Sequence, residues 1–173
     1  MRHITLITTG GTIEKTYDEA SGTLQNRRSV VRRMLRRLRL EGSIINVIEL
    51  MSKDSLHMTD DDRRAIAEAV HASGGSASLP TQSDCIVILH GTDTLTVTGE
   101  LLYARFTPPR IPIVLTGAMR PFEMVRSDAL QNLTEAVFAA GVLSPGVYCV
   151  AHGRALAFPG VKKDREAGTF VKD

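Results

Sequence analysis

Hydroxyl and carboxylate side chains recur in this sequence directly after short apolar runs. Thr12 follows two glycines in TTGGTIE, and Thr92 and Asp93 stand side by side in HGTDTLT. A threonine hydroxyl can act as a nucleophile when a base or a charged neighbour activates it. Glycines beside it would leave backbone N–H groups free to stabilise an oxyanion. Acyl transfer is therefore one chemistry that these residues could support.

Each of these segments also has an ordinary structural explanation. The glycines before Thr12 could form a simple turn or a phosphate-binding turn, although no Walker lysine follows them and no G-x-G-x-x-G occurs. Asp93 could cap a helix that begins at the next residue, and Asp54 and Ser55 could do the same further upstream. His90 ends an apolar run without metal-ligand spacing around it, so we expect a structural histidine.

Apolar runs rich in β-branched residues alternate with stretches of helical periodicity. The runs are continuous, as in strands buried on both faces of a parallel sheet. They span Ile4–Thr8, Ile44–Leu50, Cys85–Leu89, Ile113–Thr116 and Val147–Ala151. The helical stretches span Ser29–Leu40, Thr59–Ala72, Thr94–Phe106 and Ser127–Ala140. This alternation predicts an α/β fold, with a parallel sheet flanked by helices in three αβα layers.

In such a sheet, ligands bind beyond the carboxyl ends of the strands. The four segments that follow the predicted strands there are all polar: 8–14, 52–59, 90–96 and 116–123. Helix capping alone could explain one polar segment at this edge, but it explains four of them less well. Together they predict a site for a small polar substrate.

Composition narrows the class of protein. The chain has 173 residues, 43% of them hydrophobic, which predicts one globular domain over residues 1–173. A net charge of +2 gives no reason to expect a polyanion partner for the whole molecule. Cys85 and Cys149 lie in apolar runs and are expected to be buried, reduced thiols. The first apolar run is too short for a leader or a membrane span, so we expect a soluble, cytoplasmic protein without a membrane partner.

One segment departs from this balanced charge. Seven arginines fall between Arg27 and Arg39, opposite a helically spaced apolar face formed by Val30, Val31, Met34, Leu35 and Leu38. An amphipathic helix that docks its apolar face and leaves the arginines in water is the ordinary explanation. A protein that binds anionic surfaces or nucleic acid is the alternative function from another class. Any retention on DNA or heparin is expected to vanish at moderate salt and not to depend on Thr12.

The loop segments taken together resemble the bacterial-type L-asparaginase family. TGGTI at Thr9–Ile13 and HGTDT at His90–Thr94 match its signatures in full, and GAMRP at Gly117–Pro121 and SDALQNL at Ser127–Leu133 follow in the family order. The resemblance covers nearly the whole chain and implies the fold of the family's N-terminal domain. It also implies hydrolysis of L-asparagine to L-aspartate and ammonia through a threonine acyl-enzyme, without a metal or other cofactor.

The resemblance assigns roles to particular residues. The implied catalytic residues are Thr12, Tyr17, Thr92, Asp93 and Lys163, with Lys162 as the alternative lysine. The implied substrate-binding residues are Gly11, Ser55, Thr92, Asp93 and Ala118. Tyr17 is the only tyrosine in the loop from Glu14 to Gln25, which would act as a lid.

The chain also departs from the longer members of the family. They have a second, C-terminal domain that closes the site, and this chain covers only the part before it. The site would then be completed by another subunit of a homo-oligomer, by the tail from Lys163 to Asp173, or not at all. Leu56 and His57 stand where polar and acidic residues are common. Two related alternatives are the amidase subunit of a tRNA-dependent amidotransferase and a catalytically silent asparagine sensor, against which the intact Thr12 and Lys163 argue.

Overall fold

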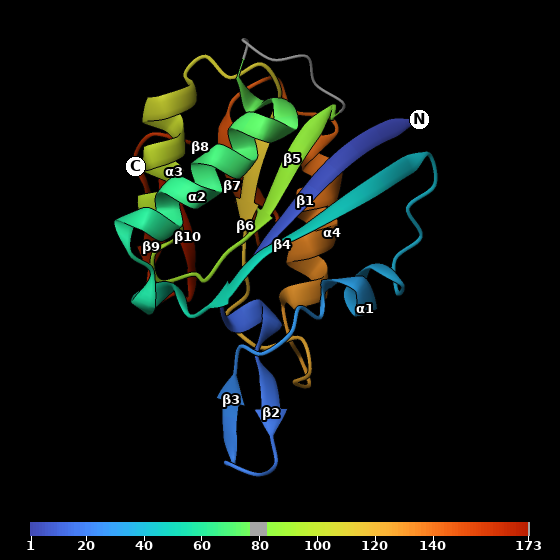
Figure 1. Ribbon diagram of the computed structural model, residues 1–173, viewed down its shortest axis with the longest axis vertical. Coiled ribbons are helices and arrows are strands. Elements are labelled where there is room, and N and C mark those ends of the chain that lie inside the picture. The colour runs from blue at the N-terminus through green and yellow to red at the C-terminus, as the bar shows by residue number, and fades with distance from the viewer. Residues whose placement is uncertain (77–82, 173) are drawn as a thin grey trace.

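The computed structural model describes residues 1–76 and 83–172. Its centre is a six-stranded sheet in the order β4-β1-β5-β6-β7-β8 (Figure 1). The first five strands run parallel, and β8 pairs antiparallel with β7. The strands are β1 (Arg2–Gly10), β4 (Ser43–Lys53), β5 (Cys85–Leu89), β6 (Ile113–Thr116), β7 (Val147–Ala151) and β8 (Arg154–Ala157).

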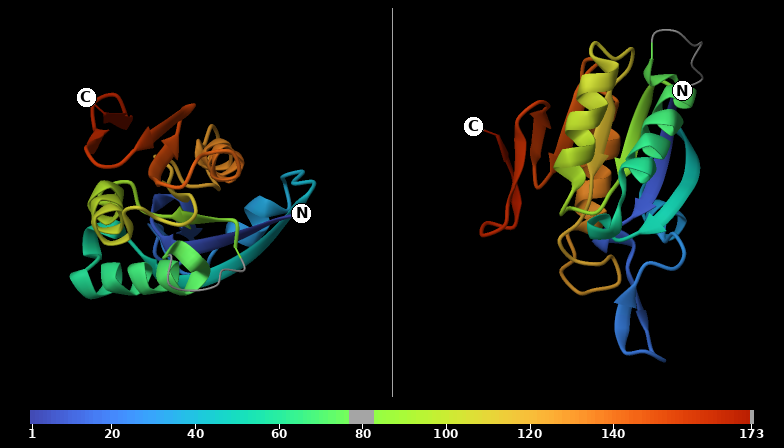
Figure 2. Two further views of the ribbon diagram at one scale, coloured as in Figure 1. Left: turned by 90° about the horizontal axis from the view of Figure 1, so that it is seen from above. Right: turned by 60° about the vertical axis from the view of Figure 1, so that its left-hand side comes forward.

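Helices cover both faces of this sheet, so the prediction of three layers is confirmed (Figure 2). The helices are α1 (Val31–Leu35), α2 (Asp60–Val70), α3 (Leu95–Phe106) and α4 (Ala129–Ala140). Alternate strand residues point to opposite faces. Ile86 and Ile88 therefore pack with α2 and α3, whereas Val87 and Leu89 pack with α1 and α4.

The strand predictions hold best in the middle of the sheet. β5, β6 and β7 have the predicted bounds, and every residue of β5 is buried. β4 is longer than predicted and lies at an edge, where Ile44 is 44% exposed and Glu49 is also exposed. The expectation of burial on both faces is therefore wrong for β4. β8 was not predicted, because its residues RALA are mostly exposed and form no apolar run.

The start of α2 follows from its sequence. Thr59 is the N-cap and accepts a hydrogen bond from the backbone N–H of Asp62, while the Asp62 carboxylate accepts from the backbone N–H of Thr59 at 2.9 Å. This reciprocal capping box satisfies two backbone donors that the helix itself cannot satisfy. The predicted start of this helix is confirmed.

The helix in the arginine-rich segment is shorter than predicted. α1 covers only Val31–Leu35, and the backbone then continues in tighter turns, with Arg37 N donating to Met34 O and Leu38 N donating to Leu35 O. Arg32 and Arg36, like Arg33 and Arg37, stand four residues apart, so a longer helix would stack like charges on one face. Burial of Val31 and Met34 in the core fixes the single turn that forms.

Two hairpins and three short helical turns complete the described structure. β2 (Thr16–Asp18) pairs with β3 (Thr23–Gln25), and β9 (Val161–Asp164) pairs with β10 (Thr169–Lys172). The turns are η1 (Thr12–Glu14), η2 (Ser55–His57) and the π-type turn η3 (His71–Gly75). The β2–β3 hairpin projects beyond the sheet, whereas β9–β10 lies beside α3 (Figures 1 and 2). Within the described ranges no helix is long and apolar enough to cross a membrane.

Candidate active site

The two motif loops are packed against each other through glycines. Gly11 has φ +77°, and a Cβ built on it would lie 2.4 Å from both Cα and N of Gly91. A Cβ on Gly91 would in turn lie 2.5 Å from the Ser55 Oγ. Any side chain at either position would push the loops apart. Contact between the two backbones therefore brings the residues that follow them, Thr12 and Thr92, to the same edge of the sheet.

Thr12 opens η1 and is half-buried. Among the described residues its hydroxyl has no hydrogen-bond partner. The expectation that both preceding glycines keep free N–H groups is wrong, since Gly10 N donates to Glu14 Oε2 at 3.1 Å and Gly11 N donates to Lys53 O at 2.8 Å. Stabilisation of an oxyanion beside Thr12 must therefore come from other donors.

Lys163 joins the second pair of predicted residues. Its ammonium donates to the Thr92 hydroxyl and to Asp93 Oδ1, each at 2.9 Å. Asp93 Oδ1 also pairs with Arg165 Nη1 at 2.9 Å. The hydrogen bond from Lys163, together with both cationic neighbours, holds the pKa of Asp93 below its usual range. Asp93 makes no capping hydrogen bond in α3, whose N-cap is Thr94, so the capping explanation does not apply to it.

The β9–β10 hairpin positions this lysine. Phe170 is 2% exposed and belongs, with Val161, to the core cluster that lies on the α2 and α3 face. Lys163 is the cross-strand partner of Phe170, so the two side chains share one face of the hairpin. Lys162 points the other way and is exposed. The structure thus favours Lys163 over Lys162, and of the predicted tail only Asp173 lies outside the described residues.

Ser55 and its neighbours line another part of the edge. Ser55 is 1% exposed and packs against Gly91, and its carbonyl accepts from the Thr94 hydroxyl at 2.9 Å. Asp54 caps η2 and pairs with Lys15 at 2.6 Å, and the hydrogen bond from Lys15 lowers its pKa. Capping therefore does explain Asp54. Leu56 is 63% exposed, so this edge presents an apolar side chain.

The loop after β6 lies beside Thr92. A Cβ on Gly117 would lie 2.3 Å from the His90 carbonyl oxygen and 3.1 Å from Thr92 Cγ2. Ala118, the next residue, is 1% exposed. His90 itself is fully buried and bonds through its ring to Gly91 O and to the Thr98 hydroxyl. Burial lowers the pKa of His90 to about 4 and keeps it neutral, which fits the structural role expected for it.

Tyr17 is the predicted site residue that the structure leaves outside the cluster. It lies on β2 of the projecting hairpin (Figure 1). Its side chain is 58% exposed, and its hydroxyl lies near the hairpin turn, 3.9 Å from where a Cβ of Gly22 would be. The backbone N–H of Tyr17 donates to Glu123 Oε2 at 3.1 Å. The Tyr17 side chain is thus directed toward the hairpin turn.

Glu14 is a buried carboxyl that the sequence patterns did not mark as a site residue. It is 1% exposed, accepts hydrogen bonds from the Ser29 hydroxyl and from Gly10 N, and lies two residues after Thr12. Burial raises its pKa to about 7. Its position in TGGTIE was visible, but its burial depends on the segment after β3, which folds over it. The sequence patterns did not mark Arg165 either, because it is the turn of the β9–β10 hairpin that brings its side chain to Asp93.

These observations define an α/β protein whose polar site lies at the carboxyl edge of a mostly parallel sheet, with two threonines held by neighbouring loops. The family model described as "Asparaginase, N-terminal" matches residues 3–168, and the chain belongs to this family. Within the described residues no group of three His, Cys, Asp or Glu side chains is placed to hold a metal ion.

Known proteins of the family share both sequence and fold with this chain. An L-asparaginase of Thermococcus kodakarensis is 36% identical over 110 residues, covering 64% of this chain and 32% of the relative. L-asparaginase 1 of Escherichia coli is 34% identical over 76% of this chain and 38% of its own length. The solved thermostable L-asparaginase of T. kodakarensis superposes with a TM-score of 0.86 at 29% identity over 98% of this chain and 51% of that chain.

Another relative bears a different name. A glutamyl-tRNA(Gln) amidotransferase subunit of Methanococcus maripaludis is 28% identical over 88% of this chain and 35% of its own length. The chain therefore spans about a third of the length of these curated relatives and about half of the solved asparaginase.

Proposed function

We propose that this chain is an L-asparaginase that hydrolyses L-asparagine to L-aspartate and ammonia. The observation that carries the proposal is the Lys163 ammonium between the Thr92 hydroxyl and Asp93, on a loop packed glycine to glycine against the loop of Thr12. Family membership and the fold shared with the solved asparaginase support it.

The reaction proceeds in two acyl-transfer steps. The Thr12 oxygen bonds to the side-chain amide carbon of asparagine, and its proton passes to the leaving nitrogen as the carbon–nitrogen bond breaks and ammonia departs. Water then attacks the ester carbon, its proton returns to the Thr12 oxygen, and aspartate leaves. An unactivated hydroxyl is a weak nucleophile. Tyr17, brought in by the hairpin, assists Thr12, while Lys163 and Asp93 tune the Thr92 hydroxyl.

The remaining residues bind the substrate. Ser55 takes the substrate carboxylate, Gly11, Thr92 and Asp93 contact the substrate, and backbone atoms at Ala118 contact it beside the scissile amide. Leu56 offers no hydrogen bond where the longer enzymes have polar side chains. We therefore expect weaker binding of asparagine than in two-domain relatives, seen as a higher KM. An apparent KM below theirs would contradict this.

The setting of the enzyme completes the proposal. Residues 1–173 form one catalytic domain, and we expect the chain to act in the cytoplasm as a homo-oligomer. One feature supports the cytoplasmic setting: Cys85 and Cys149 are free and buried, which suits a reducing compartment.

A second candidate is an amidase that delivers ammonia to a partner, as a subunit of a tRNA-dependent amidotransferase. The match to the amidotransferase relative over 88% of this chain favours it. The two functions differ in the activity of the isolated chain. A subunit that is active only with its partner has little turnover of free asparagine when it is purified alone.

The first test is ammonia release from asparagine and from glutamine by the purified chain. Thr12→Ala is the inactive variant, and Thr134→Ala, on the exposed side of α4, is the matched control. Asparagine turnover that survives in Thr134→Ala and vanishes in Thr12→Ala supports the asparaginase. A folded protein without turnover of either amide contradicts it and favours the partner-dependent amidase.

A further inference from the structure

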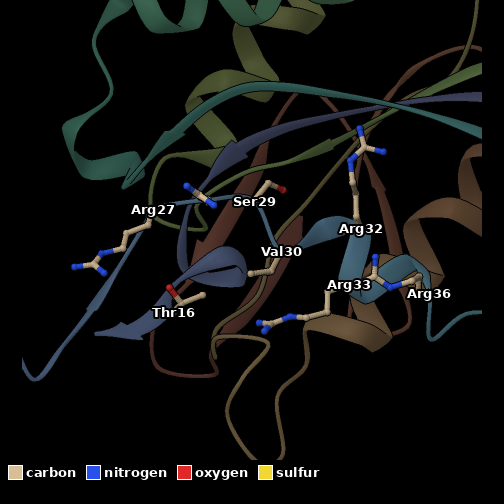
Figure 3. A pocket seen from close by; sticks show the side chains of 8 residues that line it. Thr16, Arg27, Ser29, Val30, Arg32, Arg33 and Arg36 are labelled. Carbon is tan, nitrogen blue, oxygen red and sulfur yellow. The ribbon is translucent and has the colours of Figure 1, made fainter. Parts of the chain in front are cut away.

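A second hollow of the molecule lies away from the threonines. It has a volume of about 690 Å³ and lies between the base of the β2–β3 hairpin and α1 (Figure 3). Most of its lining comes from the arginine-rich segment, with Thr16 of β2 beside it. The lining residues are Thr16, Arg27, Arg28, Ser29, Val30, Arg32, Arg33 and Arg36.

The positive charge of this hollow, here called the arginine pocket, is only partly neutralised. Three of its arginines have acidic partners: Arg27 pairs with Asp18, Arg32 with Glu49 and Arg33 with Glu123. Among the described residues Arg28 and Arg36 have no acidic partner. Two uncompensated guanidinium groups thus border a concave space. Of the three others, Arg32 and Arg33 pair with exposed carboxylates, whereas Arg27 pairs with the largely buried Asp18.

Fixed contacts hold the floor of the arginine pocket. Val30 is 7% exposed and Val31 is fully buried, so the backbone that carries Arg28 to Arg33 is anchored in the core. Ser29 bonds to the buried carboxyl of Glu14. The guanidinium groups therefore extend from a fixed base, which lowers the ordering cost of binding a ligand.

The lining indicates the chemistry of the ligand. A volume of this size suits a small molecule. Guanidinium groups present pairs of N–H donors that match the oxygens of a phosphate. Among the described residues that line the pocket none is aromatic, so it lacks the rings on which the bases of single-stranded nucleic acids commonly stack. These features favour a small ligand with several phosphate groups over a nucleic acid.

We propose that the arginine pocket is a binding site for a small polyphosphate-bearing anion, distinct from the threonine site. Arg28 and Arg36 provide the free charges, and Arg33, whose partner Glu123 is exposed, can exchange that carboxylate for phosphate. Thr16 and Arg27 flank the β2–β3 hairpin, so a bound anion also holds the base of the segment that carries Tyr17.

Isothermal titration calorimetry with tripolyphosphate tests the site. The wild-type chain is expected to bind one anion, and Arg28→Gln and Arg36→Gln are each expected to weaken binding about tenfold, as the loss of one charged hydrogen bond predicts. Arg39→Gln is the matched control, since Arg39 lies in the same segment but does not line the pocket. Absence of binding, or equal weakening by Arg39→Gln, overturns the proposal.

Two further arms separate the sources of the ligand. If adenosine triphosphate binds with the same affinity as tripolyphosphate, the pocket recognises the phosphates alone. If adenosine triphosphate binds more tightly, and Arg36→Gln still weakens that binding, the pocket is a nucleotide site. Both outcomes support the proposal. Binding of a single-stranded oligonucleotide in preference to both overturns it in favour of a nucleic-acid surface. Because none of these measurements needs turnover, their failure is independent of the asparaginase proposal.

Hydrogen exchange tests the link to the hairpin. With tripolyphosphate bound, backbone amides of residues 16–18 are expected to exchange more slowly, because the anion orders the strand that it touches. Amides of residues 169–172, in the other hairpin, provide the internal control. Unchanged exchange at 16–18 with saturating anion contradicts this link.

Discussion

The two sides of the candidate active site are held in different ways. On one side, Thr92, Asp93 and Lys163 are fixed by the contact between Gly11 and Gly91 and by the burial of Phe170. On the other side, Tyr17 lies on a projecting hairpin that is tied to the body by surface contacts such as the hydrogen bond to Glu123. The first side is held by the core, whereas the second would have to move if, as proposed, Tyr17 assists Thr12.

Glu14 lies between these two sides. It belongs to η1, directly before the hairpin, and bonds to Gly10 of β1 and to Ser29 after the hairpin. The groups whose spacing is fixed are thus placed by the core, whereas Tyr17 is placed by a short polar hairpin outside it.

The largest expected effect comes from removing the lysine of the fixed side. Lys163→Met is expected to lower kcat about 10³-fold, because Thr92 and Asp93 lose the cation that joins them. Lys162→Met is the control and should leave kcat within about threefold, since an exposed side chain outside the site contributes little. Steady-state turnover of asparagine measures both. Equal losses in the two variants would show that the fixed side is not organised by Lys163.

Glu14→Gln tests the residue between the two sides. Burial raises the pKa of Glu14 from 4.5 to about 7, so the folded state binds its proton more tightly than the unfolded state. The contribution of Glu14 to stability therefore falls as the pH rises from 4.5 to 7 and is constant above. We expect the variant to gain about 3 kcal/mol relative to wild type across this window.

Denaturant unfolding of both proteins at pH 4.5, 6 and 8 checks this expectation. Burial lowers the pKa of His90 to about 4, so the contribution of His90 to stability rises with pH where that of Glu14 falls. The stability of the wild-type protein alone therefore need not fall across this pH range. The difference between the two proteins removes the His90 contribution. A difference that does not change with pH would mean that folding leaves the pKa of Glu14 unshifted.

Gly91→Ala tests how closely the Gly91 loop packs against Ser55. The added Cβ would lie 2.5 Å from Ser55 Oγ, so one loop must shift, which we expect to cost about 2 kcal/mol of the free energy of unfolding. Gly141→Ala is the control, because its Cβ would meet only the flexible end of Arg2. Thermal unfolding should separate the two variants. A Gly91→Ala protein as stable as the control would show that the loops are loosely packed.

The smallest expected effect comes from a substitution of Tyr17 on the β2–β3 hairpin. Tyr17→Phe removes one hydroxyl from an exposed residue, so folding should be unaffected, and turnover should fall about tenfold if the hairpin brings that hydroxyl to Thr12. Tyr148→Phe, at the far end of β7, is the matched control. Turnover equal to wild type would leave Tyr17 as a surface aromatic.

The sequence allowed the middle of the fold to be predicted better than its edges. β5, β6 and β7 were predicted to the residue because strands buried on both faces are apolar without interruption. The β2–β3 and β9–β10 strands are short and partly polar, so no periodicity marks them. The arginine-rich helix was predicted too long, because its periodicity does not reveal the repulsion between stacked arginines.

The site could be predicted where a motif marks it and not where tertiary packing creates it. Thr12, Thr92 and Asp93 follow strands in recognisable motifs, and the structure brings Thr92 and Asp93 to one lysine. The choice between Lys162 and Lys163 needed the register with Phe170, which the sequence does not show. The burial of Glu14 likewise depends on a segment that folds over it from beyond the hairpin.

The contact between Gly11 and Gly91 has a thermal consequence. The gap between the two threonine loops is set by touching main-chain atoms, which have no rotamers to populate as the temperature rises. Heating can widen this gap only by separating the strands that end there. Loss of the spacing between Thr12 and Thr92 and loss of the sheet are then one event. Turnover that collapses below the Tm of the fold would therefore place the earlier loss in the β2–β3 hairpin.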